Sequence, residues 1–169
     1  MNQLTKERGF TLLEIIVSIL LVGVVAAIMG VSGAYLAKSF IAERTNADTL
    51  LKGQIAMSRI QKELNNVKKV SASSTSSITF SSYRDTGTAN NTVTLGLNGA
   101  NLLLNNFILA DKVNNFSLAY YNSFNSAANT VFSANTRLID VNLVITGWEN
   151  LPFAFNIRVA PSFDVSTGT

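Results

Sequence analysis

One carboxylate, Glu14, interrupts a long uncharged stretch near the N-terminus of this 169-residue chain. Residues 10–37 are otherwise mostly apolar, and residues 15–37 contain no charged side chain. A charged carboxylate in apolar, membrane-like surroundings costs several kcal/mol unless it has a partner or a shifted pKa. Glu14 is therefore the first residue for which a functional role is expected.

The residue types that usually carry out catalysis are missing from the sequence. The chain has no Cys and no His, which excludes disulfides, thiolate metal sites and Ser-His or Cys-His catalytic pairs. Carboxylate or Lys chemistry remains possible, but we predict no enzyme activity, no catalytic residue, no cofactor and no bound metal. Four Asp residues could be considered as calcium ligands, but they lack the clustered spacing of a calcium loop and are expected in turns and caps. They are Asp85, Asp111, Asp140 and Asp164.

The net charge of +3 is concentrated in one short segment. Residues 38–70 hold seven Lys or Arg and three Asp or Glu, whereas residues 71–169 are close to neutral. We interpret this basic surface as a solvated helix face and do not expect nucleic acid as a partner. Contact with acidic neighbours, lipid headgroups or DNA is the alternative. Six of the seven basic residues lie largely off the apolar stripe of the helix: Arg44, Lys52, Arg59, Lys62, Lys68 and Lys69.

The uncharged stretch is long enough to cross a bilayer. Residues 15–37, at ~1.5 Å each, extend about 35 Å, against a hydrocarbon core of roughly 30 Å. The apolar core of a secretory signal is much shorter. Because Lys6 and Arg8 precede the stretch, the positive-inside rule predicts a cytoplasmic N-terminus, and the rest of the protein then lies outside the inner membrane.

The start of this stretch resembles a known processing motif. A short basic leader ending in Gly, then Phe, then Glu at the fifth position and about 20 apolar residues resembles the cleavage and methylation motif of type IV prepilins. The resemblance implies that a prepilin peptidase cuts after Gly9 and methylates the new N-terminus at Phe10. It also implies that Glu14 pairs with the N-terminal ammonium of a neighbouring subunit. The motif is Gly9, Phe10, Thr11, Leu12, Leu13 and Glu14.

The order of the later segments resembles W-type minor pilins and the J-type minor pseudopilins of type II secretion. Val31 stands where major pilins often have Pro, and no disulfide can close a C-terminal loop. Ser162 stands where the family has a basic residue after Pro161. The resemblance implies a subunit that primes or caps a type IV pilus or a pseudopilus, first in the inner membrane with a periplasmic domain and then in the filament.

The implied partners are other pilin or pseudopilin subunits, the prepilin peptidase, the inner-membrane assembly platform, and membrane lipid along residues 10–37. Two other functions remain open. One is a competence-type pilin that captures DNA through the basic helix. The other is a membrane-anchored domain that matches the motif by chance.

Hydrophobic periodicity predicts an α+β fold in which one long helix packs on an antiparallel β-sheet, as in pilins. We expect a leader at 1–9, a membrane-spanning half-helix at 10–37, an amphipathic half-helix at 38–70 and a sheet domain at 71–169. The helix, about 10–69, should bury an apolar stripe, with 3-4-3 spacing in its last turns. The stripe comprises Leu36, Phe40, Ala47, Leu50, Leu51, Met57, Ile60, Leu64 and Val67.

After a polar linker at 71–77 the apolar period changes to two, which predicts strands. No helical pattern separates them, so the sheet should be antiparallel. Imperfect alternation around Asp140 suggests a bulge or burial on both faces there. The expected strands are 78–84, 92–97, 101–105, 115–122, 137–146 and 153–160, with a turn at Asn98-Gly99 and a long loop at 123–136.

Overall fold

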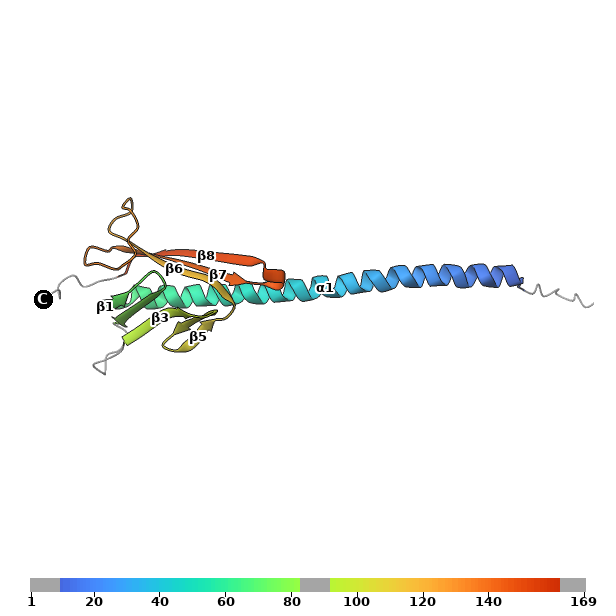
Figure 1. Ribbon diagram of the computed structural model, residues 1–169, viewed down its shortest axis with the longest axis horizontal. Helices are drawn as coiled ribbons and strands as arrows, with labels where there is room; N and C mark the ends of the chain where they lie inside the picture. Colours follow the sequence, from blue (N-terminus) through green and yellow to red (C-terminus); the bar gives the residue numbers. More distant parts are fainter. Residues whose placement is uncertain (1–9, 83–91, 162–169) are drawn as a thin grey trace, which may run out of the picture. The chain divides into compact units, whose positions relative to one another are not determined.

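A computed structural model of the chain describes residues 10–82 and 92–161. It contains one long helix, α1 (Leu12–Asn65), and eight β-strands, so the predicted α+β architecture is confirmed (Figure 1). The chain divides into two compact units, residues 1–44 and residues 45–169. We call residues 12–44 of α1 the stem and the second unit the head.

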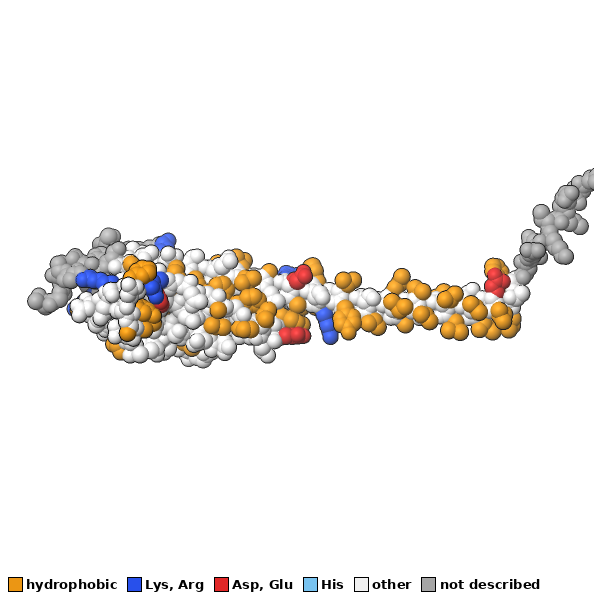
Figure 2. Space-filling view, turned by 90° about the horizontal axis from the view of Figure 1, so that it is seen from above, with side chains coloured by type: hydrophobic (Ala, Val, Ile, Leu, Met, Phe, Trp, Pro, Cys, Tyr) orange, Lys and Arg blue, Asp and Glu red, His pale blue; other side chains and the backbone are white. Residues whose placement is uncertain are grey.

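The stem is an apolar helix with no core of its own. Its most apolar 18-residue window has a mean hydropathy of 2.8, and none of that window is buried. Figure 2 shows hydrophobic side chains along most of the stem. In the described part of the chain, α1 is the one helix long and apolar enough to cross a membrane, as the sequence predicts.

The head contains two antiparallel sheets, and in each sheet the strands lie in the order in which they occur along the chain. The first consists of β1 (Val67–Ser73), β2 (Ser77–Ser82), β3 (Thr92–Asn98), β4 (Asn101–Leu104) and β5 (Phe107–Ala110). The second consists of β6 (Val113–Tyr121), β7 (Leu138–Thr146) and β8 (Pro152–Val159), with a short 3₁₀ turn at Trp148–Asn150 before β8. Each strand pairs with the next one along the chain, so simple hairpins build both sheets.

Strand β6 joins the two sheets through its free edge. The backbone N–H of Leu118 donates to the carbonyl of Thr75 at 2.7 Å. The buried Tyr120 hydroxyl donates to the carbonyl of Ser74 at 2.9 Å. These bonds satisfy polar groups that would otherwise be buried without partners, and they hold the β1–β2 turn against β6.

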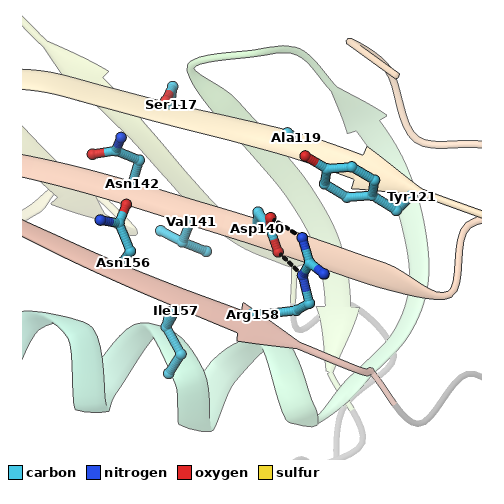
Figure 3. Close-up of a pocket in the computed structure, with 9 residues that line it drawn as sticks. All are labelled: Ser117, Ala119, Tyr121, Asp140, Val141, Asn142, Asn156, Ile157 and Arg158. Atoms are coloured by element: carbon cyan, nitrogen blue, oxygen red, sulfur yellow. Dashed lines mark hydrogen bonds and ion pairs between the residues drawn. The ribbon is translucent and has the colours of Figure 1, made fainter. Parts of the chain in front are cut away.

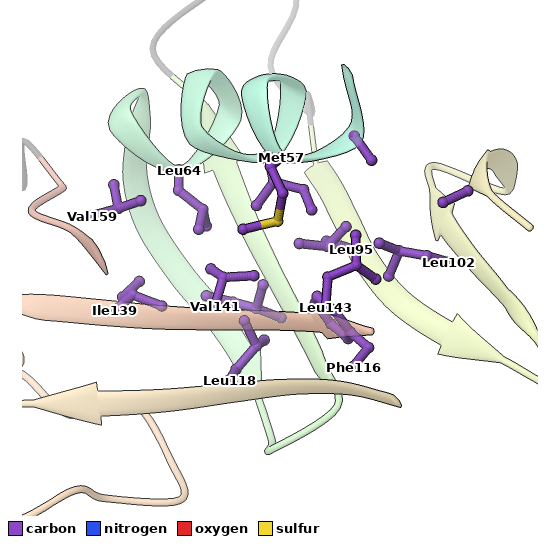
Figure 4. Close-up of a cluster of buried hydrophobic side chains, with 14 of the residues drawn as sticks. Met57, Leu64, Leu95, Leu102, Phe116, Leu118, Ile139, Val141, Leu143 and Val159 are labelled. Atoms are coloured by element: carbon purple, nitrogen blue, oxygen red, sulfur yellow. The ribbon is translucent and has the colours of Figure 1, made fainter. Parts of the chain in front are cut away.

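The core of the head lies between the last turns of α1 and the two sheets (Figure 4). Met57, Ile60 and Leu64 are buried as the sequence predicts. They pack with Leu95 and Leu102 from the first sheet, and the same cluster includes residues of β6, β7 and β8. Both sheets therefore share one hydrophobic core with the helix.

A glycine permits α1 to approach β8 closely. Gly53 is buried, and a Cβ atom at this position would overlap the ring of Phe155. Gly in a helix interior costs about 1 kcal/mol relative to Ala, so close packing of the aromatic ring accounts for its presence.

Near the base of the head, Asn46 accepts a hydrogen bond from the backbone N–H of Trp148 at 2.9 Å.

The predicted helix is too long at its C-terminal end. α1 ends at Asn65, and the side chain of Asn66 bonds the carbonyl of Lys62 at 2.6 Å. The next residues form strand β1, so Val67 is buried on a strand instead of on the helix. The polar linker expected at 71–77 is also wrong, because it contains the end of β1, a tight turn and the start of β2.

The N-terminal residues of the predicted apolar stripe are exposed within the stem or the head to which each belongs. Leu36 and Phe40 are 72% and 68% exposed on the stem, and Leu50 and Leu51 are 40% and 57% exposed on the head. Ala47 is exposed as well. The buried face of α1 begins only at Thr49 and continues through Gly53, Ala56, Met57 and Ile60.

Strand β5 was not expected from the sequence. It follows a two-residue turn in which Asn105 and Asn106 have φ of 51° and 67°, a conformation that Asn tolerates and that closes hairpins. The expected bulge near Asp140 is wrong as well. Burial alternates regularly along β7, and the register irregularity lies between Val113 and Asn115 of β6. The predicted turn at Gly99, φ 60°, is confirmed.

Truncation of Ile60 to Ala should lower the free energy of unfolding of the head by about 2–5 kcal/mol, because Ile60 is fully buried between helix and sheets. Trp148, the single Trp of the chain, lies in the head and reports its unfolding by fluorescence in the full chain held in detergent micelles. The matched control is Ile55→Ala, since Ile55 is 58% exposed on the same helix. Equal effects of the two substitutions would contradict the described packing.

Candidate assembly site in the N-terminal segment

Glu14 lies in the first turn of α1, three positions after Thr11, the residue that caps the helix. The backbone N–H of Glu14 donates to the carbonyl of Thr11 at 3.0 Å and to its side-chain Oγ1 at 3.3 Å. The positive end of the helix dipole favours a carboxylate in this turn. The local fold therefore fixes the backbone of Glu14 and leaves its side chain to bind a further cation.

Sequence analysis missed the role of Thr11 as the N-cap. The signal was present, because Thr followed three residues later by Glu is the capping-box pattern. In this chain the pattern falls inside the processing motif, so Thr11 has a local structural role as the helix cap.

The described residues of the motif are open to their surroundings. Phe10, Leu12 and Leu13 are 78%, 78% and 73% exposed, and Glu14 is exposed as well. Gly9, the predicted end of the leader, lies outside the described residues. A neighbouring chain can therefore reach both the Glu14 carboxylate and the backbone at Phe10 without displacing any part of the stem.

Two serine hydroxyl groups of the stem are satisfied within the helix itself. The hydroxyl of Ser18 donates to the carbonyl of Glu14 at 2.7 Å, and the hydroxyl of Ser32 donates to that of Ile28 at 2.9 Å. Neither hydroxyl then needs water, which suits an apolar environment. The stem glycines at 23, 30 and 33 have open space where a Cβ would lie, so other helices can come close there.

The basic residues of the head are partly neutralised. Lys52 lies 2.8 Å from Asp111, and Arg59 lies 2.8 Å from Glu63 one helical turn later. The hydrogen bond from Lys52 holds the pKa of the Asp111 carboxyl below its usual value. Lys68 and Lys69 are on β1 and not on the helix. Of the six basic residues that the sequence places off the apolar stripe, four therefore lie on α1, and two of these four are paired with carboxylates.

Two of the four aspartates considered as calcium ligands form ion pairs. Asp111 pairs with Lys52, and Asp140 pairs with Arg158; Asp85 and Asp164 lie outside the described residues. Within residues 10–82 and 92–161, no group of three or more carboxylates is placed to hold a metal ion.

Comparison with known proteins supports the motif at the N-terminus. Residues 4–30 match the family model of the prokaryotic N-terminal methylation motif. No curated protein and no solved structure matches the chain. The matched segment includes the expected cleavage position and the first turns of α1, and together with the apolar helix it supports a membrane-anchored, type IV pilin-like protein. Such a protein is processed by a prepilin peptidase and interacts with other pilin subunits.

The affinity of the chain for DNA should be weak, because two basic side chains of the helix, Lys52 and Arg59, are already paired with carboxylates. We expect a Kd of about 10⁻⁴ to 10⁻⁶ M at physiological salt, falling steeply as salt is raised. Fluorescence anisotropy with labelled duplex DNA, on the full chain in nanodiscs of neutral lipid, measures this. Submicromolar binding at physiological salt would contradict the prediction and favour a DNA-capturing pilin.

Proposed function

We propose that the chain is a minor pilin or pseudopilin, a structural subunit without enzymatic activity. After cleavage between Gly9 and Phe10 it would prime or cap a type IV pilus or a type II secretion pseudopilus. The observation that supports this most strongly is an exposed carboxylate, Glu14, in the first turn of an otherwise uncharged apolar stem.

The apolar stem requires an apolar environment at every stage. Its hydrophobic side chains are exposed in the single chain, and exposure of this much apolar surface to water is strongly unfavourable. Before assembly, a bilayer would cover the hydrophobic side chains of the stem. In a filament, neighbouring stems would cover them, and close helix contact at the stem glycines would replace contact with lipid.

The carboxylate of Glu14 explains how the subunit would be selected for assembly. Cleavage after Gly9 creates an ammonium group on Phe10, a second charge in a medium of low dielectric constant. A carboxylate from another subunit is the complement of that ammonium, and breaking such a pair is costly because it leaves a charge buried alone. The pairing would therefore set the position of each incoming stem.

Orientation follows from the charges that flank the stem. Lys6 and Arg8 precede it, so the leader would face the cytoplasm, where the peptidase acts, and the head would lie in the periplasm. The shared core of helix and sheets makes the head a packed module, as a filament subunit requires.

The mature protein should begin at N-methylated Phe10 and comprise residues 10–169 when it is made in cells that contain a prepilin peptidase. Mass spectrometry of the intact chain and of its N-terminal peptide measures this. Gly9→Ala should be processed better than Gly9→Leu, because a site that closes on the backbone at Gly9 admits a methyl group more readily than an isobutyl group.

Cells that lack the peptidase provide the control, since the chain should there keep Met1. A protein that still begins at Met1 in peptidase-containing cells, or is cut after Ala26 or Ala27, would contradict the proposal. Normal processing of Gly9→Leu would show that Gly9 is incidental to recognition.

A further inference from the structure

The outer face of the three-stranded sheet has a hollow of about 400 Å³ on the side away from the core (Figure 3). Two cross-strand rows form its floor. Ser117, Asn142 and Asn156 lie opposite one another on β6, β7 and β8, and Ala119, Asp140 and Arg158 form the next row. The small side chain of Ala119 lies between those of Ser117 and Tyr121, and all three line the hollow from the same face of β6.

The charged pair in the hollow is already neutralised. Arg158 donates from Nε to Oδ1 of Asp140 at 2.5 Å and from Nη2 to Oδ2 at 2.6 Å. Such a bidentate pair is directional and strong for its kind. The guanidinium also lies over the ring of Tyr121, at 4.9 Å from the centroid, and over that of Phe124, at 5.2 Å. The pair is therefore held in one arrangement and offers little net charge to a ligand.

The other polar groups are neutral and include an acceptor with no donor. Oδ1 of Asn142 is shielded from solvent, and no hydrogen-bond partner for it is present in the described part of the chain. A buried acceptor without a partner costs about 1–3 kcal/mol, and rotation of the Asn142 amide that exposes this oxygen to the hollow would let a ligand or water bond it. Asn156 and Ser117 add amide and hydroxyl groups on either side, and each of them can donate and accept.

We propose that this hollow binds one ring of a neutral carbohydrate. A saccharide ring presents closely spaced hydroxyl groups that donate and accept, which complements the amides of Asn142 and Asn156 and the hydroxyl of Ser117. A charged ligand gains little here because Asp140 and Arg158 neutralise each other. A purely apolar ligand would leave the amide groups without partners. The site is independent of the N-terminal motif, and it would give the head a receptor-binding role beyond filament assembly.

Saturation-transfer difference NMR tests the proposal on the full chain in phosphocholine nanodiscs, which contain no sugar headgroup. The probes are glucose, galactose, mannose, N-acetylglucosamine and N-acetylgalactosamine, each titrated singly. At least one should show saturable transfer with a millimolar Kd. Ala119→Leu, which fills the hollow but removes no polar group, should abolish that signal or weaken it at least tenfold.

Ala154→Leu is the matched control, because Ala154 is exposed on the outer face of β8 and does not line the hollow. It should bind as the unmodified chain does. Asn142→Leu should lose binding while keeping the Trp148 fluorescence of the folded head. Absence of saturable transfer from all five sugars, or equal binding by the Ala119→Leu and Ala154→Leu variants, would overturn the proposal. Displacement of the bound sugar by phosphate or acetate at equal concentration would overturn the neutral ligand class.

Discussion

The proposed assembly of this protein depends on one constraint, the neutralisation of the Glu14 carboxylate in an apolar environment. Glu14 is the only charged side chain between residues 10 and 37. The cost of keeping it there is high unless a cation is close. Thr11 fixes its backbone by capping the helix, and its exposed carboxylate can meet a charge from another chain. The same surroundings explain why Ser18 bonds its own helix.

The head obeys a different constraint, the need to cover one face of a helix with two sheets. Ile60 and Leu64 are fully buried in a core that draws on both sheets. Gly53 allows the ring of Phe155 to lie against the helix backbone. Hydrogen bonds from β6 to the β1–β2 turn join the sheets at their common border. Only the inner face of β6, β7 and β8 contributes to this core, and the proposed carbohydrate site lies on their outer face.

Sequence predicted the parts of the fold that follow from strong periodicity. The long apolar helix, the buried Met57, Ile60 and Leu64, and six of the strands follow from spacing alone. Two strands formed by short apolar segments next to pairs of Asn residues were not predicted. Val67 continues the helical period but follows Asn65 and Asn66, so the chain turns into β1. Strand β5 depends on left-handed backbone at Asn105 and Asn106, which periodicity does not reveal.

The candidate sites also differ in how far the sequence predicts them. The motif at Gly9 to Glu14 could be identified because its residues are contiguous, whereas the cap at Thr11 became clear only from its hydrogen bond. The hollow on the outer face could not be predicted, because Ser117, Asn142 and Asn156 come from three strands and meet only through sheet register.

The proposed pairing of Glu14 is tested most directly by measuring how much Glu14→Val is incorporated into filaments or the assembly-priming complex. The variant is compared with the unmodified chain at equal expression, by quantitative immunoblotting of sheared filaments and of membranes. We predict that Glu14→Val inserts into the membrane and is cleaved after Gly9, but is lost from the assembled fraction. Incorporation of the cleaved variant at the level of the unmodified chain would contradict the proposed pairing of Glu14 with a neighbour's N-terminal ammonium.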